Sequence, residues 1–190
     1  MNSDKSVKLG FALVATLSGL WTGKPAFALG EYFSGGFSSV SSYRWIYSNM
    51  TSSYANAYVI PAAAQWNGIS SQVSLTRVTS GSYTVNARVE TGTDLNVGGR
   101  MTPYCSAGSG AADCLNNTWT SARVIGYENI MASYNYTSTQ RIKTFIHEFG
   151  HSLSLAHVIG GSAAAVMRQG RSNFGVQAYD RANLQAKWGN

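Results

Sequence analysis

The positions of the histidines constrain this chain more than any other feature. The 190-residue sequence contains three, and all of them, His147, His151 and His157, lie within residues 147–157. Two histidines four residues apart lie on one face of a helix, so their ring nitrogens can reach one metal ion. A lone histidine is usually an ordinary core or surface residue, but here chance would have to place all three at metal-ligand spacing. The segment therefore predicts a metal-binding helix.

The apolar residues around these histidines have helical spacing. They recur every three or four residues, at Ile142, Phe145, Ile146, Phe149 and Leu153. Thr137 and Gln140 have the spacing of a capping box, which marks the start of a helix. At 100° per residue the apolar stripe faces away from His147, Glu148 and His151. We expect the helix to bury this stripe and to present both imidazoles to a cleft.

Glu148 directly follows the first histidine and is expected to face the open side of the metal. Three histidine ligands leave a fourth position for water and lower the pKa of that water towards about 7. A carboxylate beside it can take a proton as the water attacks a peptide carbonyl and can later pass it to the leaving amine. The predicted reaction is hydrolysis of internal peptide bonds, with Glu148 as the catalytic residue.

The segment 147–157 resembles the extended zinc-binding motif of the metzincin peptidases, H-E-x-x-H-x-x-G-x-x-H, with Ser154 in place of the glycine. Met167 is similar to the methionine of their Met-turn, and residues 176–189 resemble the closing helix of the matrixin type. The resemblance implies one catalytic Zn²⁺ on the three histidines, and no residues are assigned to calcium. The family glycine has a positive φ, a conformation that costs a serine on the order of 1 kcal/mol.

The resemblance also implies a metzincin-like α+β fold. It would consist of a twisted mixed five-stranded sheet, a backing helix, an active-site helix and a C-terminal helix. Substrate is expected to lie extended along the edge strand near residues 95–104 and to pair with its backbone. The catalytic domain would span residues 43–190.

The pattern of apolar residues in the rest of the chain favours the same α+β class. Period-two alternation and short apolar runs predict strands at residues 43–47, 73–75, 83–89, 95–104 and 122–128. Helical spacing begins at Thr51, where Pro61 must kink the helix or mark its true start.

Residues 1–28 have the pattern of a secretory signal peptide. Lys5 and Lys8 precede an apolar run over residues 9–20, and residues 26–28 match the small-x-small pattern of a cleavage site. A membrane anchor is the alternative, but the run is shorter than the roughly 20 residues that span a bilayer. We expect a secreted protein without a membrane anchor after cleavage, with a flexible mature N-terminus at residues 29–42.

Cys105 and Cys114 are the two cysteines of the chain and lie in a segment rich in Gly, Ala and Ser. An exported chain meets an oxidising environment, in which such a pair normally forms a disulfide. Zinc ligation is the alternative, but no nearby residues complete a set of four Cys or His ligands. A disulfide is therefore predicted.

The predicted reaction implies a protein or peptide substrate as the partner. The chain has 14 Lys and Arg against 8 Asp and Glu, and these cations are scattered singly, so a nucleic-acid partner is not expected. We expect a monomer. Two alternatives to an endopeptidase remain: a secreted zinc-containing binding protein of the same fold without turnover, and a hydrolase of cell-wall peptides.

Overall fold

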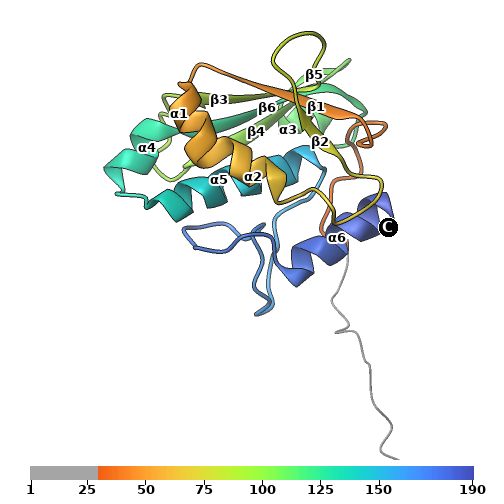
Figure 1. The fold of residues 1–190 in the computed structure, drawn as a ribbon. Helices are drawn as coiled ribbons and strands as arrows, with labels where there is room; N and C mark the ends of the chain where they lie inside the picture. The colour runs from red at the N-terminus through yellow and green to blue at the C-terminus, as the bar shows by residue number, and fades with distance from the viewer. Residues whose placement is uncertain (1–29) are drawn as a thin grey trace, which may run out of the picture.

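The computed structural model describes residues 30–190, and the predicted signal peptide, residues 1–28, lies outside them. In this part of the chain one mixed sheet is covered on one face by helices, which confirms the α+β class (Figure 1). The strands are β1 Tyr43–Ser48, β2 Leu75–Arg77, β3 Val85–Glu90, β4 Gly99–Cys105, β5 Gly108–Ser109 and β6 Trp119–Tyr127. No helix within residues 30–190 is long and apolar enough to cross a membrane.

The strand order is β2-β1-β3-β6-β4-β5. The first four of these strands run parallel to one another, and β4 runs antiparallel to β6 and β5. The alternation predicted for residues 83–89 is confirmed in part, because Val85 and Ala87 are fully buried. Tyr83 lies before the strand and is exposed. The sheet therefore buries one face and leaves the other to solvent, because successive side chains along a strand point to opposite faces.

The predicted count of five strands is wrong, because the described sheet has six. The additional strand is β5, whose two residues pair with Tyr104 and Cys105 at the end of β4. A two-residue strand carries no alternation in its sequence, and its position depends on the turn that folds it back. It extends the sheet at one end only.

The chain around β5 is closed by the predicted disulfide. Cys105 and Cys114 are joined, with their Cα atoms 5.7 Å apart, and neither cysteine is free. Cys114 ends the short helix α3, Ala111–Cys114, and is fully buried. The bond therefore ties the excursion after β4 to the core.

The backing helix is continuous but irregular. Thr51 caps it, and it runs through α1 Ser52–Tyr54, the π-helical turn η1 Ala55–Val59 and α2 Ile60–Ala64. Pro61 lies at the start of α2, directly after the wide turn, where its ring and its missing N–H are tolerated. Pro61 thus starts a new helical segment without breaking the helix.

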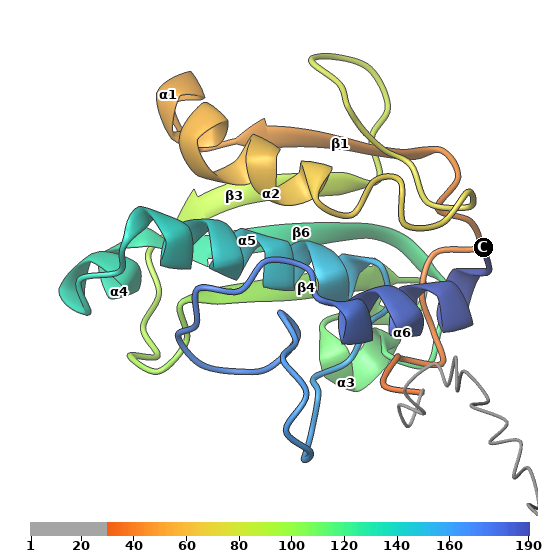
Figure 2. The ribbon, with the colours of Figure 1, turned by 60° about the horizontal axis from the view of Figure 1, so that its bottom comes forward.

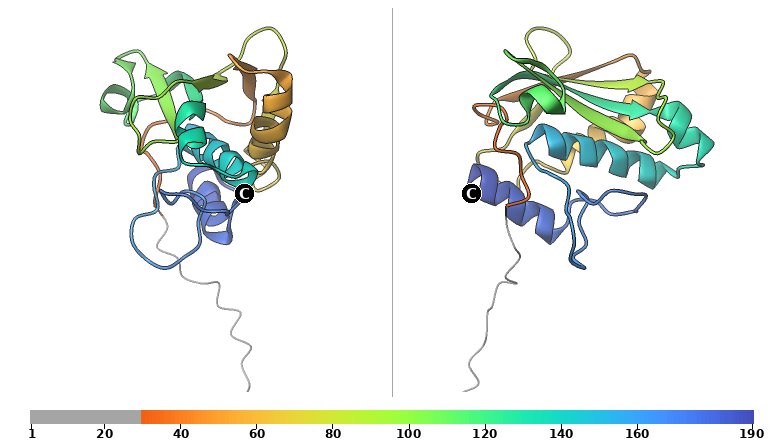
Figure 3. Two further views of the ribbon diagram at one scale, coloured as in Figure 1. Left: turned by 90° about the vertical axis from the view of Figure 1, so that its left-hand side faces the viewer. Right: turned by 180° about the vertical axis from the view of Figure 1, so that it is seen from behind.

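The core lies between the sheet and two helices, the backing helix and α5 Ser138–Ser152. Figure 2 shows both of them against the same face of the sheet, and the two side views of Figure 3 agree. The rings of Trp45 on β1 and Phe149 on α5 meet edge to face with centroids 5.3 Å apart. Trp66, after α2, is completely buried and donates its indole N–H to the Ile146 carbonyl. These aromatic contacts fix α5 against the sheet.

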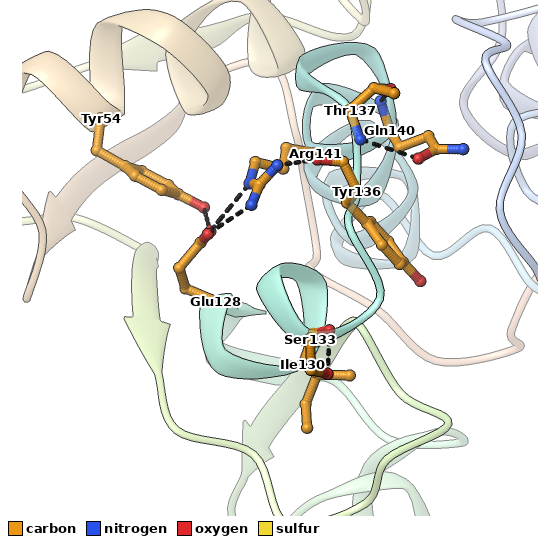
Figure 4. A network of polar contacts seen from close by, with 8 residues as sticks. All are labelled: Tyr54, Glu128, Ile130, Ser133, Tyr136, Thr137, Gln140 and Arg141. Carbon is orange, nitrogen blue, oxygen red and sulfur yellow. Dashed lines mark hydrogen bonds and ion pairs between the residues drawn. The ribbon is translucent and has the colours of Figure 1, made fainter.

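A polar network anchors the beginning of α5 (Figure 4). β6 ends at Tyr127, so the strand predicted to reach Glu128 is one residue too long, and Glu128 begins the helix α4, Glu128–Ser133. The Glu128 carboxylate accepts hydrogen bonds from the Arg141 guanidinium, at 2.8 Å, and from the Tyr54 hydroxyl, at 2.6 Å. Arg141 also donates to the carbonyl of Tyr136. One carboxylate thereby joins α1, α4 and α5.

The described part of the predicted flexible N-terminus, residues 30–42, is packed against the domain. Tyr32 bridges to Leu155 and Gly36 to Thr118, while Phe37 and Val40 are buried in the core. The fold therefore begins before Tyr43, contrary to the prediction. Apolar anchors spaced through a Gly- and Ser-rich stretch are enough to hold it, although the composition resembles that of a linker.

Replacing both Cys105 and Cys114 with serine should lower the free energy of unfolding by about 2–3 kcal/mol, since the bond closes a short loop in the unfolded chain. Urea denaturation of the metal-free protein measures this difference. Wild type under a reducing agent is the control and should match the variant. Equal stability of variant and oxidised wild type would contradict the stabilising role of the bond.

Candidate metal centre

Helix α5 begins and turns as its sequence predicts. The Thr137 hydroxyl accepts from the backbone N–H of Gln140, and the side-chain carbonyl of Gln140 accepts from the backbone N–H of Thr137, so the capping box is confirmed. Phe145 and Phe149 are fully buried, which places the predicted apolar stripe in the core. The opposite side of the helix carries His147 and His151 into a cleft.

The three histidines converge on one point. His147 and His151 come from α5, and His157 comes from the loop that follows it. Each pair of their Nε2 atoms is 3.1 Å apart. Within residues 30–190 this is the one group of His, Cys, Asp or Glu side chains that could hold a metal ion. The structure thus brings together all three predicted ligands.

The outer nitrogens of two of these rings are held by backbone carbonyls. His147 Nδ1 lies 2.8 Å from the Val166 oxygen, and His151 Nδ1 lies 2.8 Å from the Leu155 oxygen. An N–H at Nδ1 that donates to a carbonyl leaves the Nε2 lone pair for a metal. Both rings are therefore oriented as ligands.

The donor set fits a zinc ion. The three nitrogens, 3.1 Å apart, lie close enough together to bind one small ion at the usual Zn–N distance of about 2.0–2.1 Å. Burial lowers the pKa of each of the three histidines, that of His151 to about 3. The imidazoles are consequently neutral at pH 7, which is the form that binds metal.

The turn after α5 carries Ser154 in the conformation expected of the motif's glycine. Its φ is 68°, and the residue is completely buried. Its hydroxyl has no hydrogen-bond partner among the described residues, and a Cβ on Gly36 would collide with it. This turn directs the chain to His157, so the protein accepts a locally unfavourable serine there.

Met167 lies buried beside α5. Asp180, at the start of α6 Ala178–Trp188, accepts from the amides of Val166, at 2.8 Å, and Met167, at 3.2 Å. A Cβ on Gly150 would collide with the Met167 sulfur and approach Trp66 to 2.8 Å. The absence of a side chain at Gly150, inside the histidine motif, lets the methionine turn pack directly on α5.

Glu148 lies in the same cleft as the histidines. The residue is 5 % exposed, and a backbone hydrogen bond from Met101 on β4 reaches its carboxyl group. Burial raises the pKa of Glu148 to about 8, against the opposing effect of the nearby cation of Lys143. The group can therefore both hold and release a proton near neutral pH.

The cleft itself has a volume of about 630 Å³ and runs between α5 and β4. β4 is bonded to β6 along one side, but on the other it pairs with β5 only at Tyr104 and Cys105. Residues 99–102 therefore present a strand edge to the cleft with no strand pairing to it in the described residues, whereas the Pro103 carbonyl accepts a hydrogen bond from the Gly110 amide. The predicted edge strand is confirmed, although it begins at Gly99 instead of Leu95.

Several residues of the site were not predicted from the sequence, among them Phe33 and Lys143. The ring of Phe33, from the N-terminal segment, stacks on His151 with centroids 5.9 Å apart. Lys143 is buried and lines the cleft one helical turn before His147. The spacing of four residues between Lys143 and His147, which places both on one helix face, was a detectable signal, whereas nothing near Phe33 in the sequence points to the histidines.

A scan against models of known protein families and a search of curated proteins both found no match to this chain. The metzincin resemblance consequently stays a prediction, and the function has to come from the chemistry of the site.

Replacing Ser154 with glycine should raise the free energy of unfolding by about 1 kcal/mol, because it removes the strain of a positive φ and an unpaired buried hydroxyl. Urea denaturation measures the change. Asn135→Gly is the matched control: Asn135 has a φ of 53° but is exposed, and asparagine tolerates this conformation, so little gain is expected. A less stable Ser154→Gly variant would refute the interpretation.

Zinc should stabilise the folded protein, since only the folded chain brings the three nitrogens together. At a free zinc concentration 100 times the dissociation constant, bound zinc should raise the free energy of unfolding by about 2.7 kcal/mol. Denaturation with and without a chelator measures it, together with the zinc content of the purified protein. His157→Ala should abolish both the gain and the bound zinc. Zinc-independent stability of the wild type would contradict the site.

Proposed function

We propose that this protein is a secreted, zinc-dependent endopeptidase of the metzincin type, most similar to the matrixins. The observation that carries the proposal is the convergence of three histidine Nε2 atoms, each 3.1 Å from the others, beside a buried carboxylate and a free strand edge. Ligands, proton carrier and substrate-binding edge are the three parts that hydrolysis of a peptide bond at a metal requires.

His147, His151 and His157 would hold the ion, and the carbonyls of Val166 and Leu155 keep two of the rings in place. When bound, zinc supplies Lewis-acid chemistry, polarising the peptide carbonyl and lowering the pKa of water. Glu148 takes the proton of the attacking water and hands it to the leaving amine. Its hydrogen bond from Met101 fixes the carboxyl group between helix and strand while it does so.

The substrate would be an extended protein or peptide segment. The backbone groups of residues 99–102 that are bonded neither to β6 nor to Glu148 can pair with it as an added strand, which requires little of its sequence. Two glycines, at positions 98 and 99, keep the wall beside the cleft low: a Cβ on Gly99 would come within 2.7 Å of Thr144 and 3.0 Å of Glu148. The edge therefore approaches the catalytic carboxylate as closely as a backbone can.

Secretion is supported by the pattern of residues 1–28 and by the disulfide, since such bonds persist in oxidising compartments. A metal-binding protein without turnover, the main alternative, has no use for a carboxylate next to the ligands, and Glu148 argues against it. A hydrolase of cell-wall peptides would use the same residues on a different substrate.

Glu148→Gln should lower casein cleavage by about 10²–10⁴-fold, because the amide can no longer carry the proton, while zinc content stays unchanged. The protein lacking residues 1–28 is assayed for proteolysis and for bound zinc. Glu90→Gln is the matched control and should retain activity, since Glu90 is on β3, where it pairs with Arg88.

Zinc-loaded wild type that cleaves neither casein nor a broad peptide library would overturn the endopeptidase proposal and favour binding without turnover. Cleavage restricted to cell-wall peptides would identify the other alternative. Full activity of Glu148→Gln would remove Glu148 from the mechanism.

A further inference from the structure

Lys143 has an unusual position for a lysine. It is 5 % exposed, comes from α5 one helical turn before His147, and lines the cleft together with Glu148. Its Nζ donates to the carbonyls of Arg168, at 2.9 Å, and Gly170, at 3.0 Å. Both carbonyls belong to the segment that follows Met167 and forms a wall of the cleft. The ammonium group is therefore held at a defined point of the cavity.

This buried cation has no anionic partner in direct contact. Among residues 30–190 the ion pairs of Lys and Arg are Arg88 with Glu90 and Arg141 with Glu128. The carboxylates that act on Lys143 from a distance are Glu148 and Asp180. Burying a charge without a counter-ion is costly, so lysines that are buried are normally paired. An ammonium group has three N–H donors, and the two carbonyls use two of them.

The surroundings also favour an anion. Arg100 on β4 lines the same cleft, and Glu148 is the acidic residue that lines it. Arg171 lies next to this region, with its guanidinium 5.2 Å from the ring centroid of Tyr134 and 5.5 Å from that of Tyr136. A bound divalent metal would add further positive charge. A substrate carboxylate that enters the cleft would lie near the cations of Lys143 and Arg100. The acidic residue there, Glu148, carries a proton during the reaction.

We propose that Lys143 determines specificity, and that the cavity between it and Glu148 binds an acidic side chain of the substrate residue that follows the scissile bond. The proposal rests on the endopeptidase function given above. Glu148 passes its proton to the leaving amine, so the residue carrying that amine lies on the Glu148 side of the metal. Lys143 precedes Glu148 on α5, on the side away from His151, and it therefore faces that residue's side chain.

A structural role is the competing explanation, since Lys143 also holds the wall at Arg168 and Gly170. The two explanations differ in what they predict for substrate charge. If Lys143 only holds the wall, its replacement changes the cleavage rate of all peptides by the same factor. If Lys143 determines specificity, its replacement changes the ratio of the kcat/KM values for an acidic peptide and its neutral isostere.

The test uses pairs of peptides identical except for Glu or Gln after the scissile bond. Zinc-loaded wild type should cleave the Glu peptide with a kcat/KM about ten- to a hundredfold higher than the Gln peptide. Lys143→Met should bring the ratio of the two kcat/KM values close to one, and Lys143→Arg should preserve a preference for Glu. Calorimetric binding of the same peptides to Glu148→Gln protein, in which cleavage is expected to be at least about a hundredfold slower, should show the same preference.

A wild-type ratio near one in both kcat/KM and binding would overturn the proposal. This test needs no variant, so the proposal can be refuted even if the Lys143→Met protein does not fold. A preference for Glu that survives in Lys143→Met would also overturn it. Failure of the endopeptidase function looks different: wild type would then cleave neither peptide of the pair nor casein.

Discussion

The site depends above all on how α5 is packed. Its apolar stripe, with Phe145 and Phe149 completely buried, is pressed against the sheet, and Trp66 holds the helix through the Ile146 carbonyl. A helix that is fixed on one side presents residues 147 and 151 in a fixed direction on the other. The geometry of two of the three ligands is therefore a consequence of hydrophobic burial several ångströms away from them.

The third ligand depends on contacts between distant parts of the chain. After α5 the chain turns at Ser154 with a positive φ, the segment at Tyr32 bridges to Leu155, and Phe33 stacks on His151. Asp180 then fixes the turn at Met167 beneath the helix. Strain at one residue is tolerated because several independent contacts hold the turn that brings His157 to the other histidines.

The electrostatics of the cleft follow from burial. Removal from water raises the pKa of Glu148 and lowers that of the histidines, so that neutral ligands and a proton-carrying carboxyl group coexist. Burial lowers the pKa of Lys143 to about 8, against the pull of Glu148 and Asp180. The proposed catalytic and specificity groups are thus two buried ionisable groups whose pKa values are shifted in opposite directions.

The sequence by itself determined what depends on residues close together along the chain: the spacing of the histidines, the capping box and stripe of α5, the alternation of β3 and the pairing of two nearby cysteines. Only the tertiary structure decided the sixth strand, the packing of residues 30–42, the contact of Met101 with Glu148 and the place of Lys143 at the cleft wall. Periodicity reports which face of an element is apolar, but it carries no information on which distant segment covers that face. Those choices are made by contacts between residues far apart in the chain, and they form when the sheet and helices pack together.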